Sequence, residues 1–355
     1  MARSSLPDFE YVSLEDPETR AIAAEDPKGF LSHRQDRVIF DEIQRAPELL
    51  GYLQGIVDER REVGRFVLTG SHQLRLREAV AQSLAGRTSI LHLLPLSIPE
   101  LRAAGFGFEQ FEEYLLHGFL PRVYDQQQRP RVAYASYFQT YVERDVRQLI
   151  QLKDATLFEK FMKLLAGRVG HLVNLASLSN DVGVDAKTIQ SWLSILEASF
   201  VIFRVPPHFN NFGKLLTKSP KVYFTDTGLL CHLLGIEEAH QVTRDPLVGA
   251  LFENLVVLEL LNARFNSARR PNLAFYRDLR GKEIDLLLSE GRKLTGVEIK
   301  SSATYHSAFK ERLKWFNEHV APLERACIVY SGERQEFSDG IEAIPFASAA
   351  ELAHG

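Results

Sequence analysis

The chain has 355 residues, 45% of them hydrophobic and 25% charged, a composition typical of an intracellular globular protein with two or three domains. Its 42 basic and 46 acidic side chains give a formal charge of -4. This charge excludes the class of proteins that bind nucleic acid through a large overall positive charge, so any DNA contact must be local. We find no run of about 18 apolar residues that predicts a membrane span. The two cysteines, Cys231 and Cys327, lack metal-ligand spacing, so we expect a cytoplasmic protein without a membrane partner.

The first elements alternate between strands and helices. We predict strands at 9–14, 38–40 and 66–68, and helices at 16–25 and 47–61. This order is typical of a parallel sheet, whose ligands lie beyond the carboxyl ends of the strands. Asp41, Glu42 and Ser71 fall at that edge. The alternative, equally weighted from spacing alone, is that Asp41 and Glu42 only start the helix that follows.

P-loop nucleotide hydrolases have adjacent Asp and Glu residues at the end of an apolar strand. The Asp belongs to the shell of ligands around magnesium, and the Glu polarises the attacking water. Such domains also need Gly-x-x-x-x-Gly-Lys-Ser/Thr to surround the phosphates. Neither Gly213-Lys214 nor Gly281-Lys282, the Gly-Lys pairs of this sequence, completes that pattern. Losing four or five amides and a lysine removes about 7–15 kcal/mol of phosphate binding. We therefore expect no useful ATP binding, and either a misassigned start or a truncated relic.

The middle of the chain is predicted to be helical. Residues 98–124 and 130–151 carry apolar stripes at helical spacing, which we assign to packing. Helices at 175–181 and 185–197, followed by a strand at 200–205, predict a helix-turn-helix of the winged-helix kind. The second helix offers Lys187, Gln190 and Ser191 as candidate nucleic-acid contacts. Additional basic residues in the predicted wing are His208, Lys214, Lys218 and Lys221.

Winged-helix modules serve either DNA or protein partners. Because the polar face of the second helix carries a single lysine, and phosphate neutralisation supplies most of the affinity for DNA, we favour protein packing over DNA binding. A local DNA contact remains the alternative.

The C-terminal third contains a predicted hairpin with strands at 283–288 and 295–300. Pairing Glu290 with Lys293 across a two-residue turn places Asp285 opposite Glu298. Facing carboxylates repel unless a lysine or a cation lies between them. The same register puts Glu283 opposite Lys300, and it places on the other, buried face Ile284, Leu286, Leu288, Val297 and Ile299. The alternative is a solvated charged hairpin held by a Glu283–Lys300 pair.

Glu253 lies within an apolar helix upstream of this hairpin, and a buried carboxylate needs a partner. The order Glu253, Asp285, Glu298, Lys300 resembles the PD-(D/E)xK nuclease motif, with Ile284 in place of the usual proline. In that fold the acids hold magnesium and the lysine positions or activates water. The resemblance therefore implies Mg²⁺ as a cofactor and DNA as a partner.

Most of the chain also resembles a widespread prokaryotic family of AAA-type ATP-binding proteins. In that family Asp41 would be the magnesium-shell acid, Glu42 the general base and Ser71 the γ-phosphate sensor. Arg87 would be a candidate phosphate-facing arginine, and ATP the cofactor of full-length relatives. The segments that carry the resemblance include FEYVSLEDPETRAIAAEDPKGFL, VIFDEIQRAPELL, RFVLTGSHQL, SLAGRTSILHLLPLSIPEL, YFQTYVERDV, KVYFTDTGLLCHLLG, GKEIDLLL and GVEIKSS.

These observations predict an α/β protein of several domains. We expect an incomplete P-loop-type parallel sheet in a truncated AAA-type core (1–96), a helical region (97–155), a winged-helix-like domain (156–240) and a nuclease-like α/β domain (241–355). The predicted function is that of an AAA-family ATP-binding protein without ATPase activity as written, with a nuclease-like domain acting on DNA. The alternative is a non-enzymatic module that binds DNA, a protein partner or a second copy of itself.

Overall fold

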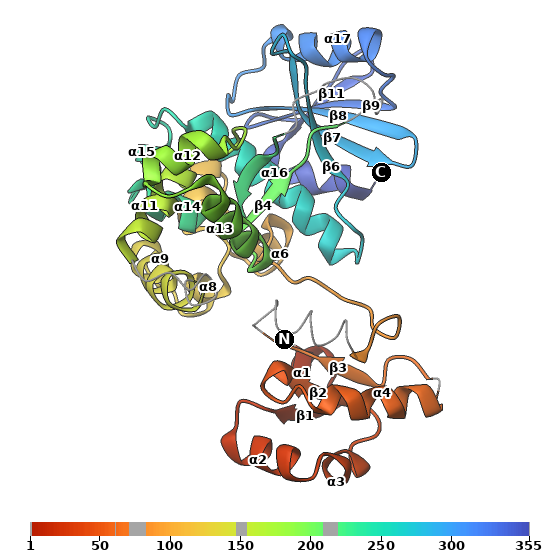
Figure 1. Cartoon of the computed structure of the whole chain (residues 1–355). Coiled ribbons are helices and arrows are strands. Elements are labelled where there is room, and N and C mark those ends of the chain that lie inside the picture. Colours follow the sequence, from red (N-terminus) through yellow and green to blue (C-terminus); the bar gives the residue numbers. More distant parts are fainter. Residues whose placement is uncertain (1, 61, 71–82, 147–154, 209–218, 355) are drawn as a thin grey trace. The chain divides into compact units, whose positions relative to one another are not determined.

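The computed structural model describes residues 2–60, 62–70, 83–146, 155–208 and 219–354 (Figure 1). The chain divides into two compact units, residues 1–90 and residues 91–355. Among the described residues, no helix combines the length and hydrophobicity needed to span a membrane.

The smaller unit is built on a parallel sheet with the strand order β1-β2-β3. Its middle strand, β2, has Val38, Ile39 and Phe40 fully buried, as expected for a strand covered on both faces. Side chains of Asp16 and Asp26 cap the two helices that follow β1. The elements are β1 (Glu10–Ser13), β2 (Val38–Asp41), β3 (Phe66–Leu68), α1 (Ala2–Ser5), α2 (Pro17–Glu25), α3 (Pro27–Ser32), η1 (Ile43–Arg45) and α4 (Leu49–Arg60). All five predicted elements are confirmed to within two residues at each end.

The first part of the larger unit is helical, as predicted. Its helices are α6 (Ile98–Ala103), α7 (Phe111–His117), α8 (Pro121–Asp125), α9 (Pro130–Tyr137), η2 (Phe138–Val146), α11 (Ala155–Ala166), α12 (Leu175–Val182), α13 (Ala186–Ala198), α14 (Thr227–Leu234) and α15 (Ala239–Val242). Between α12 and α13, Gly183 adopts a φ of 93°, a left-handed conformation that glycine tolerates. The predicted helix-turn-helix is therefore present at its predicted position.

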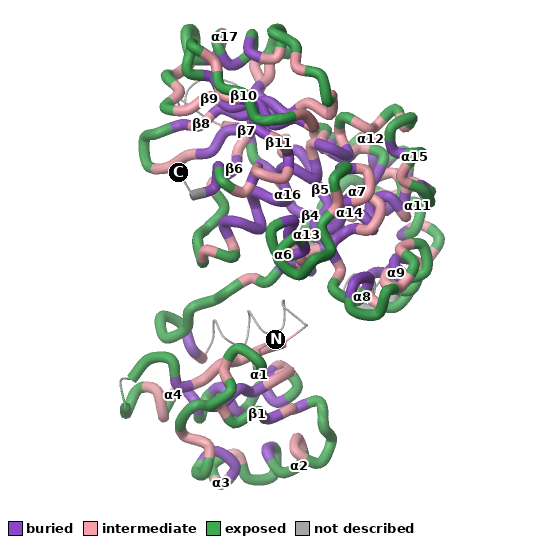
Figure 2. The backbone as a smooth tube through the Cα atoms, turned by 180° about the vertical axis from the view of Figure 1, so that it is seen from behind, coloured by how far each residue is buried: buried purple, intermediate pink, exposed green. Residues whose placement is uncertain are grey.

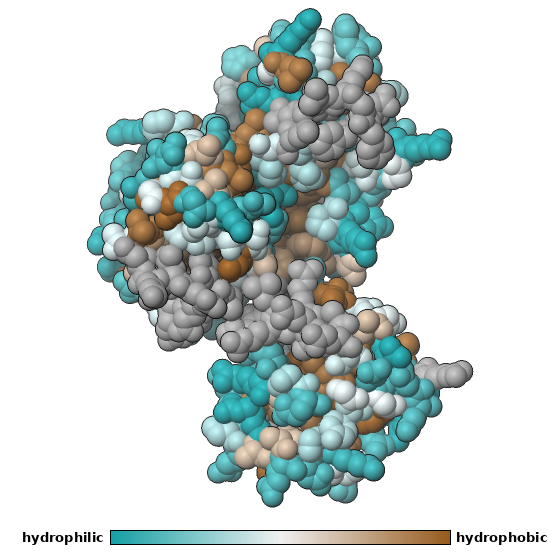
Figure 3. All heavy atoms as spheres, viewed as in Figure 1, coloured by the Kyte–Doolittle hydropathy of each residue, from teal (hydrophilic) through white to brown (hydrophobic). Residues whose placement is uncertain are grey.

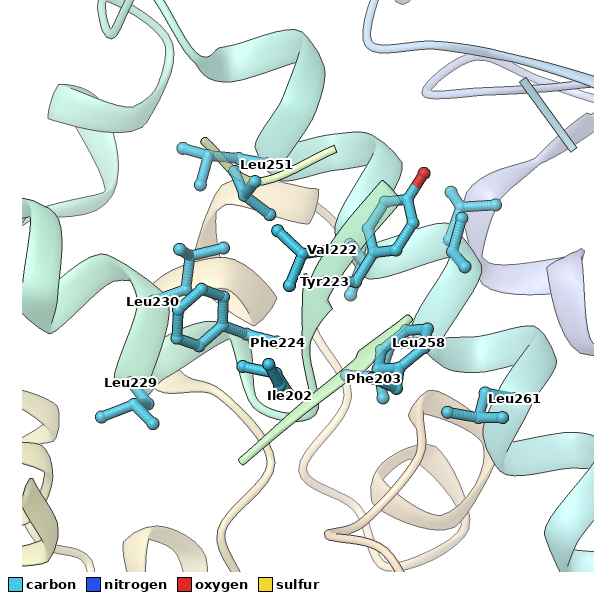
Figure 4. Close-up of a cluster of buried hydrophobic side chains, with 14 of the residues drawn as sticks. Ile202, Phe203, Val222, Tyr223, Phe224, Leu229, Leu230, Leu251, Leu258 and Leu261 are labelled. Atoms are coloured by element: carbon cyan, nitrogen blue, oxygen red, sulfur yellow. The ribbon is translucent and has the colours of Figure 1, made fainter. Parts of the chain in front are cut away.

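A two-stranded antiparallel sheet follows α13. It pairs β4 (Ile202–Val205) with β5 (Lys221–Phe224). Figure 4 shows their apolar side chains, among them Phe203 and Phe224, beside leucines of α14 and of the long helix α16 (Val248–Asn266). Nearly every residue of α16 from Leu251 to Arg264 is buried, which Figure 2 shows as a continuous purple stretch. This helix therefore belongs to the common core of the helical region and the C-terminal domain.

The C-terminal domain contains a mixed sheet with the order β10-β11-β9-β8-β7-β6. Strands β6, β7 and β8 are successive antiparallel neighbours, whereas β8, β9 and β11 run parallel. The elements are β6 (Leu273–Arg277), β7 (Glu283–Glu290), β8 (Lys293–Lys300), η3 (Ser307–Lys310), α17 (Glu311–His319), β9 (Arg325–Tyr330), β10 (Gln335–Glu336), β11 (Ile341–Pro345) and η4 (Phe346–His354). The chain is thus α/β, with a small parallel sheet, a helical middle and a mixed C-terminal sheet.

The predicted hairpin register is confirmed for the five residue pairs next to the turn. Glu290 pairs with Lys293 across Gly291, and the ladder continues to Leu286 opposite Val297. It ends there because β7 contains a bulge, with two residues, Asp285 and Leu286, facing one residue of β6.

The bulge corrects one predicted face. Beyond the extra residue the alternation of side chains reverses, so Ile284 packs with Leu287 and α17 instead of with Leu286 and Leu288 on the α16 side. Both faces of this sheet are apolar and covered. The outer surface of α17 and its neighbouring loops, which faces away from the sheet, is mostly hydrophilic in the view of Figure 3.

Candidate functional site

Asp41 ends β2 at the carboxyl edge of the smaller sheet, as predicted. Tyr11 donates its hydroxyl to Asp41 Oδ2 at 2.5 Å, and the Thr69 hydroxyl donates to Asp41 Oδ1. The hydrogen bond to Asp41, together with burial, raises the pKa of Tyr11. Two neutral hydroxyls, one on β1 and one directly after β3, therefore orient this carboxylate.

Glu42 follows Asp41 in the left-handed region, with a φ of 58°, which is uncommon for a residue with a side chain. Gln44 donates its amide to Glu42 Oε2 at 2.5 Å, and Arg45 Nε lies 3.8 Å from the same oxygen. Glu42 occupies the residue before η1 but makes no side-chain capping hydrogen bond there. The helix-start alternative therefore does not describe what the Glu42 side chain does.

Of the other two nucleotide-site candidates, Arg87 is paired with a residue other than Asp41 and Glu42. Arg87 forms a two-pronged pair with Asp58 of α4, with Nε 2.5 Å from Oδ1 and Nη2 3.0 Å from Oδ2. Ser71 lies outside the described residues. The roles predicted for Arg87 and Ser71 stay predictions.

Lys300 bridges two buried carboxylates of the C-terminal sheet. Its Nζ lies 3.0 Å from Asp285 Oδ2 and 2.7 Å from Glu298 Oε2. Asp285 is 7% exposed and Glu298 is 0% exposed. The backbone N–H of Ile299 donates to Asp285, and Arg312 Nη1 lies 3.8 Å from an oxygen of each acid. The solvated-hairpin alternative is therefore wrong, since both acids are buried and neutralised within the protein.

These two acids ionise differently. Burial alone would raise the pKa of Asp285, but the ammonium groups of Lys300 and Lys221 and the N–H of Ile299 outweigh it and lower that pKa. For Glu298, burial and the charge of Asp285 outweigh Lys300 and raise the pKa to about 8. At neutral pH Asp285 is therefore ionised and Glu298 holds a proton. Glu298 Oε1 is buried without a hydrogen-bond partner among the described residues.

Glu253 and Glu283 share a second buried lysine. Lys221 Nζ lies 2.9 Å from Glu253 Oε1 and 2.6 Å from Glu283 Oε1, and Lys221 is 2% exposed. The Tyr223 hydroxyl also donates to Glu253 Oε1, at 2.5 Å. Two predictions are thereby corrected. Glu283 takes Lys221 instead of Lys300, and Lys221 does not face DNA from the wing, because its ammonium is buried between carboxylates.

Carboxylate oxygens are the ligands that a hard cation such as Mg²⁺ prefers. The four acids of this region, however, are not arranged to bind one together. Among the described residues, no three or more His, Cys, Asp or Glu side chains are placed to bind a metal ion together. Instead, each of the four acids contacts a lysine ammonium group, Lys221 serving Glu253 and Glu283 and Lys300 serving Asp285 and Glu298.

Helix α13 exposes the predicted polar face. Lys187, Gln190 and Ser191 are exposed, while Ile189 and Trp192 on the opposite face are buried in the core. The helix is therefore amphipathic, with its polar face toward solvent. Of the predicted wing residues, Lys214 and Lys218 lie outside the described residues.

Sequence reasoning missed the partners of both acidic sites. Tyr11 lies on β1 and Thr69 directly follows β3, and a parallel sheet brings such positions to one edge. Lys221 alternates with Tyr223 in an otherwise apolar strand, a pattern that marks two polar side chains on one face. This alternation can be seen in the sequence. The carboxylate that Lys221 and Tyr223 contact, however, belongs to Glu253 on α16, far from them along the chain.

Comparison with known families identifies three successive domains. An AAA domain matches residues 1–102, a domain of unknown function (DUF8612) matches residues 108–240, and another (DUF4143) matches residues 248–349. An AAA domain implies nucleotide binding in the family.

Relatives are found in several bacteria. Uncharacterized proteins of Mycobacterium tuberculosis and Mycobacterium bovis are each 31% identical over 324 residues, covering 90% of this chain and 70% of theirs. An uncharacterized protein of Haemophilus influenzae is 25% identical over 292 residues, covering 78% of this chain and 68% of its own. A Vibrio cholerae protein of known crystal structure covers 89% of both chains, but at 13% identity and a TM-score of 0.23 it supports no argument about fold.

This chain therefore belongs to the family of AAA-domain proteins that includes the mycobacterial relatives.

Proposed function

We propose that this AAA-family protein carries a C-terminal domain of the PD-(D/E)xK nuclease type, which acts on DNA with a divalent cation. The observation that supports the proposal is the convergence of Asp285, Glu298 and Lys300 next to the bulge of β7. Glu253 of α16 is linked to the first residue of β7 by Lys221, whose ammonium contacts both Glu253 and Glu283. The motif residues are carried by α16, β7 and β8, with Asp285, Glu298 and Lys300 in direct contact and Glu253 on the neighbouring lysine.

The residues of the chain have separable roles in this proposal. Magnesium, when bound, would supply a Lewis acid, with oxygens of Glu253, Asp285 and Glu298 as its ligands. Lys300 orients Asp285 and Glu298, and is the residue that would position a water for cleavage. Because Glu298 holds a proton up to about pH 8, and that proton has to leave before its carboxylate can bind a cation, we expect metal binding to strengthen as the pH rises toward that value.

The test is the response of the full chain to manganese. Millimolar Mn²⁺ should raise the melting temperature of the wild type by mass action, and Asp285→Asn should abolish that response. Lys300→Ala should keep the metal response but lose cleavage of a DNA substrate. If the wild type and Asp285→Asn melt identically with and without millimolar Mn²⁺, the proposal is wrong.

For the AAA domain, we propose that Asp41 and Glu42 are the acids of a nucleotide site, with Ser71 and Arg87 as its further members. The hydroxyls of Tyr11 and Thr69 hold Asp41, and the Gln44 amide holds Glu42. The chain as given contains no Gly-x-x-x-x-Gly-Lys segment. We therefore expect calorimetric titration with ATP and magnesium to show no binding in the low micromolar range. Such binding would contradict this expectation.

A second candidate function is a non-enzymatic module that binds DNA, a protein or a second copy of the chain. The observation that favours it is that each of the four acids contacts a lysine ammonium group, so the cluster has internal partners without any metal. In that case Mn²⁺ should change nothing, and partner binding should depend on Lys187, Gln190 and Ser191 of α13. Weakened partner binding by Lys187→Ala without any metal response would support this function over the first.

A further inference from the structure

One face of α17 begins at the buried pair of Asp285 and Glu298. Arg312, in the first turn of this helix, is exposed and places Nη1 3.8 Å from an oxygen of each acid. Trp315 follows Arg312 by three residues and His319 follows Trp315 by four, a spacing that puts the three side chains on one side of the helix. The rings of Trp315 and His319 are stacked, with their centroids 5.7 Å apart.

The loop between β6 and β7, residues 278–282, meets this face of α17. The Lys282 ammonium lies 4.1 Å from the centre of the Trp315 ring, which is a cation–π contact. Arg280 and Lys282 are exposed, and neither forms an ion pair within the described part of the chain. Leu279, the residue before Arg280, is 81% exposed, so the loop is open to solvent. Two positive charges of this loop are therefore available to an anion from outside the chain.

Asp278 holds the loop in one shape. Its Oδ1 accepts the backbone N–H groups of Arg280 and Lys282, each at 2.8 Å. The Asp278 N–H also donates to the Lys282 carbonyl at 3.0 Å, and Gly281 turns the chain with a φ of 83°. The single acid of the loop thus binds the backbone, while the basic side chains on either side of Gly281 stay exposed. Such a loop presents its charges without having to be ordered by a ligand.

The chemistry of this surface suits a nucleic-acid backbone. Lysine and arginine neutralise phosphates, and an aromatic ring between them offers a face to a sugar or a base. The formal charge of the whole chain is -4, so DNA contact requires a local basic surface of this kind. His319 Nδ1 lies 3.9 Å from Glu318, so we assign the phosphate contacts to the arginines and the lysine and not to this histidine.

We propose that Arg280, Lys282 and Arg312 form a basic strip that binds the phosphate backbone of duplex DNA and leads it to Asp285 and Lys300. The strip is continuous with that site, because Arg312 contacts its acids and Lys282 contacts the next turn of the same helix. This inference rests on the proposed nuclease-like function and adds the surface that holds its substrate. Binding by the strip depends on charge and needs no metal ion.

The test measures the affinity of full-length proteins for a fluorescently labelled DNA duplex by anisotropy, in EDTA and over a range of salt concentrations. The double variant Arg280→Gln with Lys282→Gln removes two charges and keeps the backbone hydrogen bonds to Asp278. It should bind at least about tenfold more weakly than the wild type near 0.1 M salt. The slope of log affinity against log salt should become shallower by about 1.8, because each lost phosphate contact removes about 0.9. Arg312→Gln should reduce the slope by about 0.9.

The matched control is the double variant Arg270→Gln with Arg292→Gln. These exposed arginines precede β6 and follow β7, so they lie at the opposite end of both strands, and the variant loses the same charge. It should bind DNA like the wild type, as should Lys187→Gln of α13. Equal weakening by the two double variants would show that only net charge matters, and would overturn the inference. Weakening by Lys187→Gln alone would place the DNA on α13 and overturn it as well.

The outcomes separate this inference from the proposed function. Binding in EDTA that depends on Arg280 and Lys282 supports the strip even if Mn²⁺ leaves the melting temperature unchanged, in which case the strip serves the non-enzymatic DNA-binding function. If Mn²⁺ raises the melting temperature but the double variant binds DNA like the wild type, the metal site stands and the strip is overturned. Absence of wild-type binding to the duplex at about 50 mM salt also overturns the strip, whatever the response to Mn²⁺.

Discussion

The two acidic sites of this protein, described each within its own unit, use opposite means to hold their carboxylates. In the smaller unit, Asp41 takes hydrogen bonds from two neutral hydroxyls at the edge of a sheet. In the C-terminal domain, Asp285 and Glu298 lie inside the structure and share the ammonium of Lys300. An acid at an edge can rely on water for the rest of its solvation, whereas a buried acid needs an opposite charge or a proton. Position relative to the core thus determines the partner.

The largest expected effect comes from removing the charge that the buried pair depends on. Lys300→Ala leaves Asp285 and Glu298 facing each other without an ammonium, so we expect a loss of about 3–5 kcal/mol in the free energy of unfolding. Urea unfolding followed by tryptophan fluorescence measures it, because the two tryptophans, Trp192 and Trp315, both lie in the larger unit. Lys300→Arg is the matched control and should lose much less. A loss below about 1 kcal/mol for Lys300→Ala would contradict the buried-pair description.

A third acid sharpens the comparison, because it is buried with neither hydroxyls nor an ammonium. Glu259 on α16 is 2% exposed and accepts only the backbone N–H of Ile98, at 3.1 and 3.0 Å, among the hydrogen bonds of the described residues. Burial raises the pKa of Glu259 to about 8. At neutral pH this carboxyl therefore holds a proton.

The sign of the pH dependence follows from this raised pKa. The unfolded chain releases the Glu259 proton near pH 4.3, whereas the folded chain keeps it to about pH 8, so raising the pH within that window favours unfolding. We expect the wild type to lose about 2–3 kcal/mol relative to Glu259→Gln between about pH 5 and pH 7, at about 1.4 kcal/mol per pH unit. Parallel urea unfolding at the two pH values measures this difference. Equal pH dependence of the two proteins would show that Glu259 is ionised in the folded state.

The smallest effect is expected at the exposed site. Tyr11→Phe removes one neutral hydrogen bond to Asp41, and since Tyr11 is 38% exposed, water can replace the lost hydroxyl. We expect the free energy of unfolding of the smaller unit to fall by about 0.5–1.5 kcal/mol, near the lower end of that range. Hydrogen exchange of the β1 and β2 amides measures it locally, with the exposed Tyr52→Phe of α4 as control. A loss as large as that for Lys300→Ala would show that the two sites do not differ as described.

Local sequence patterns predicted the elements well. The five predicted strands and helices of the smaller unit, the helix-turn-helix and the hairpin lie where periodicity and turn residues placed them, whereas α1, α3 and η1 were not predicted. The pairing of Glu290 with Lys293 followed from a two-residue turn, because turn length sets the register of a hairpin. For Glu42, by contrast, the sequence predicted either a general base or a residue that caps the following helix. The left-handed backbone conformation of Glu42 could not be predicted from the neighbouring residues.

What the sequence determined by itself is local: which segments form strands or helices, which faces of α13 are apolar, and which acids stand near one another across the hairpin turn. Only the tertiary structure decided which cations these acids meet. The bulge at Asp285 and Leu286 reversed the predicted face of Ile284, and Lys221 reached Glu253 from 32 positions earlier in the chain. The physical reason is that a buried charge takes its partner from whatever element packs against it, and packing between distant elements is not encoded in the spacing of neighbouring residues.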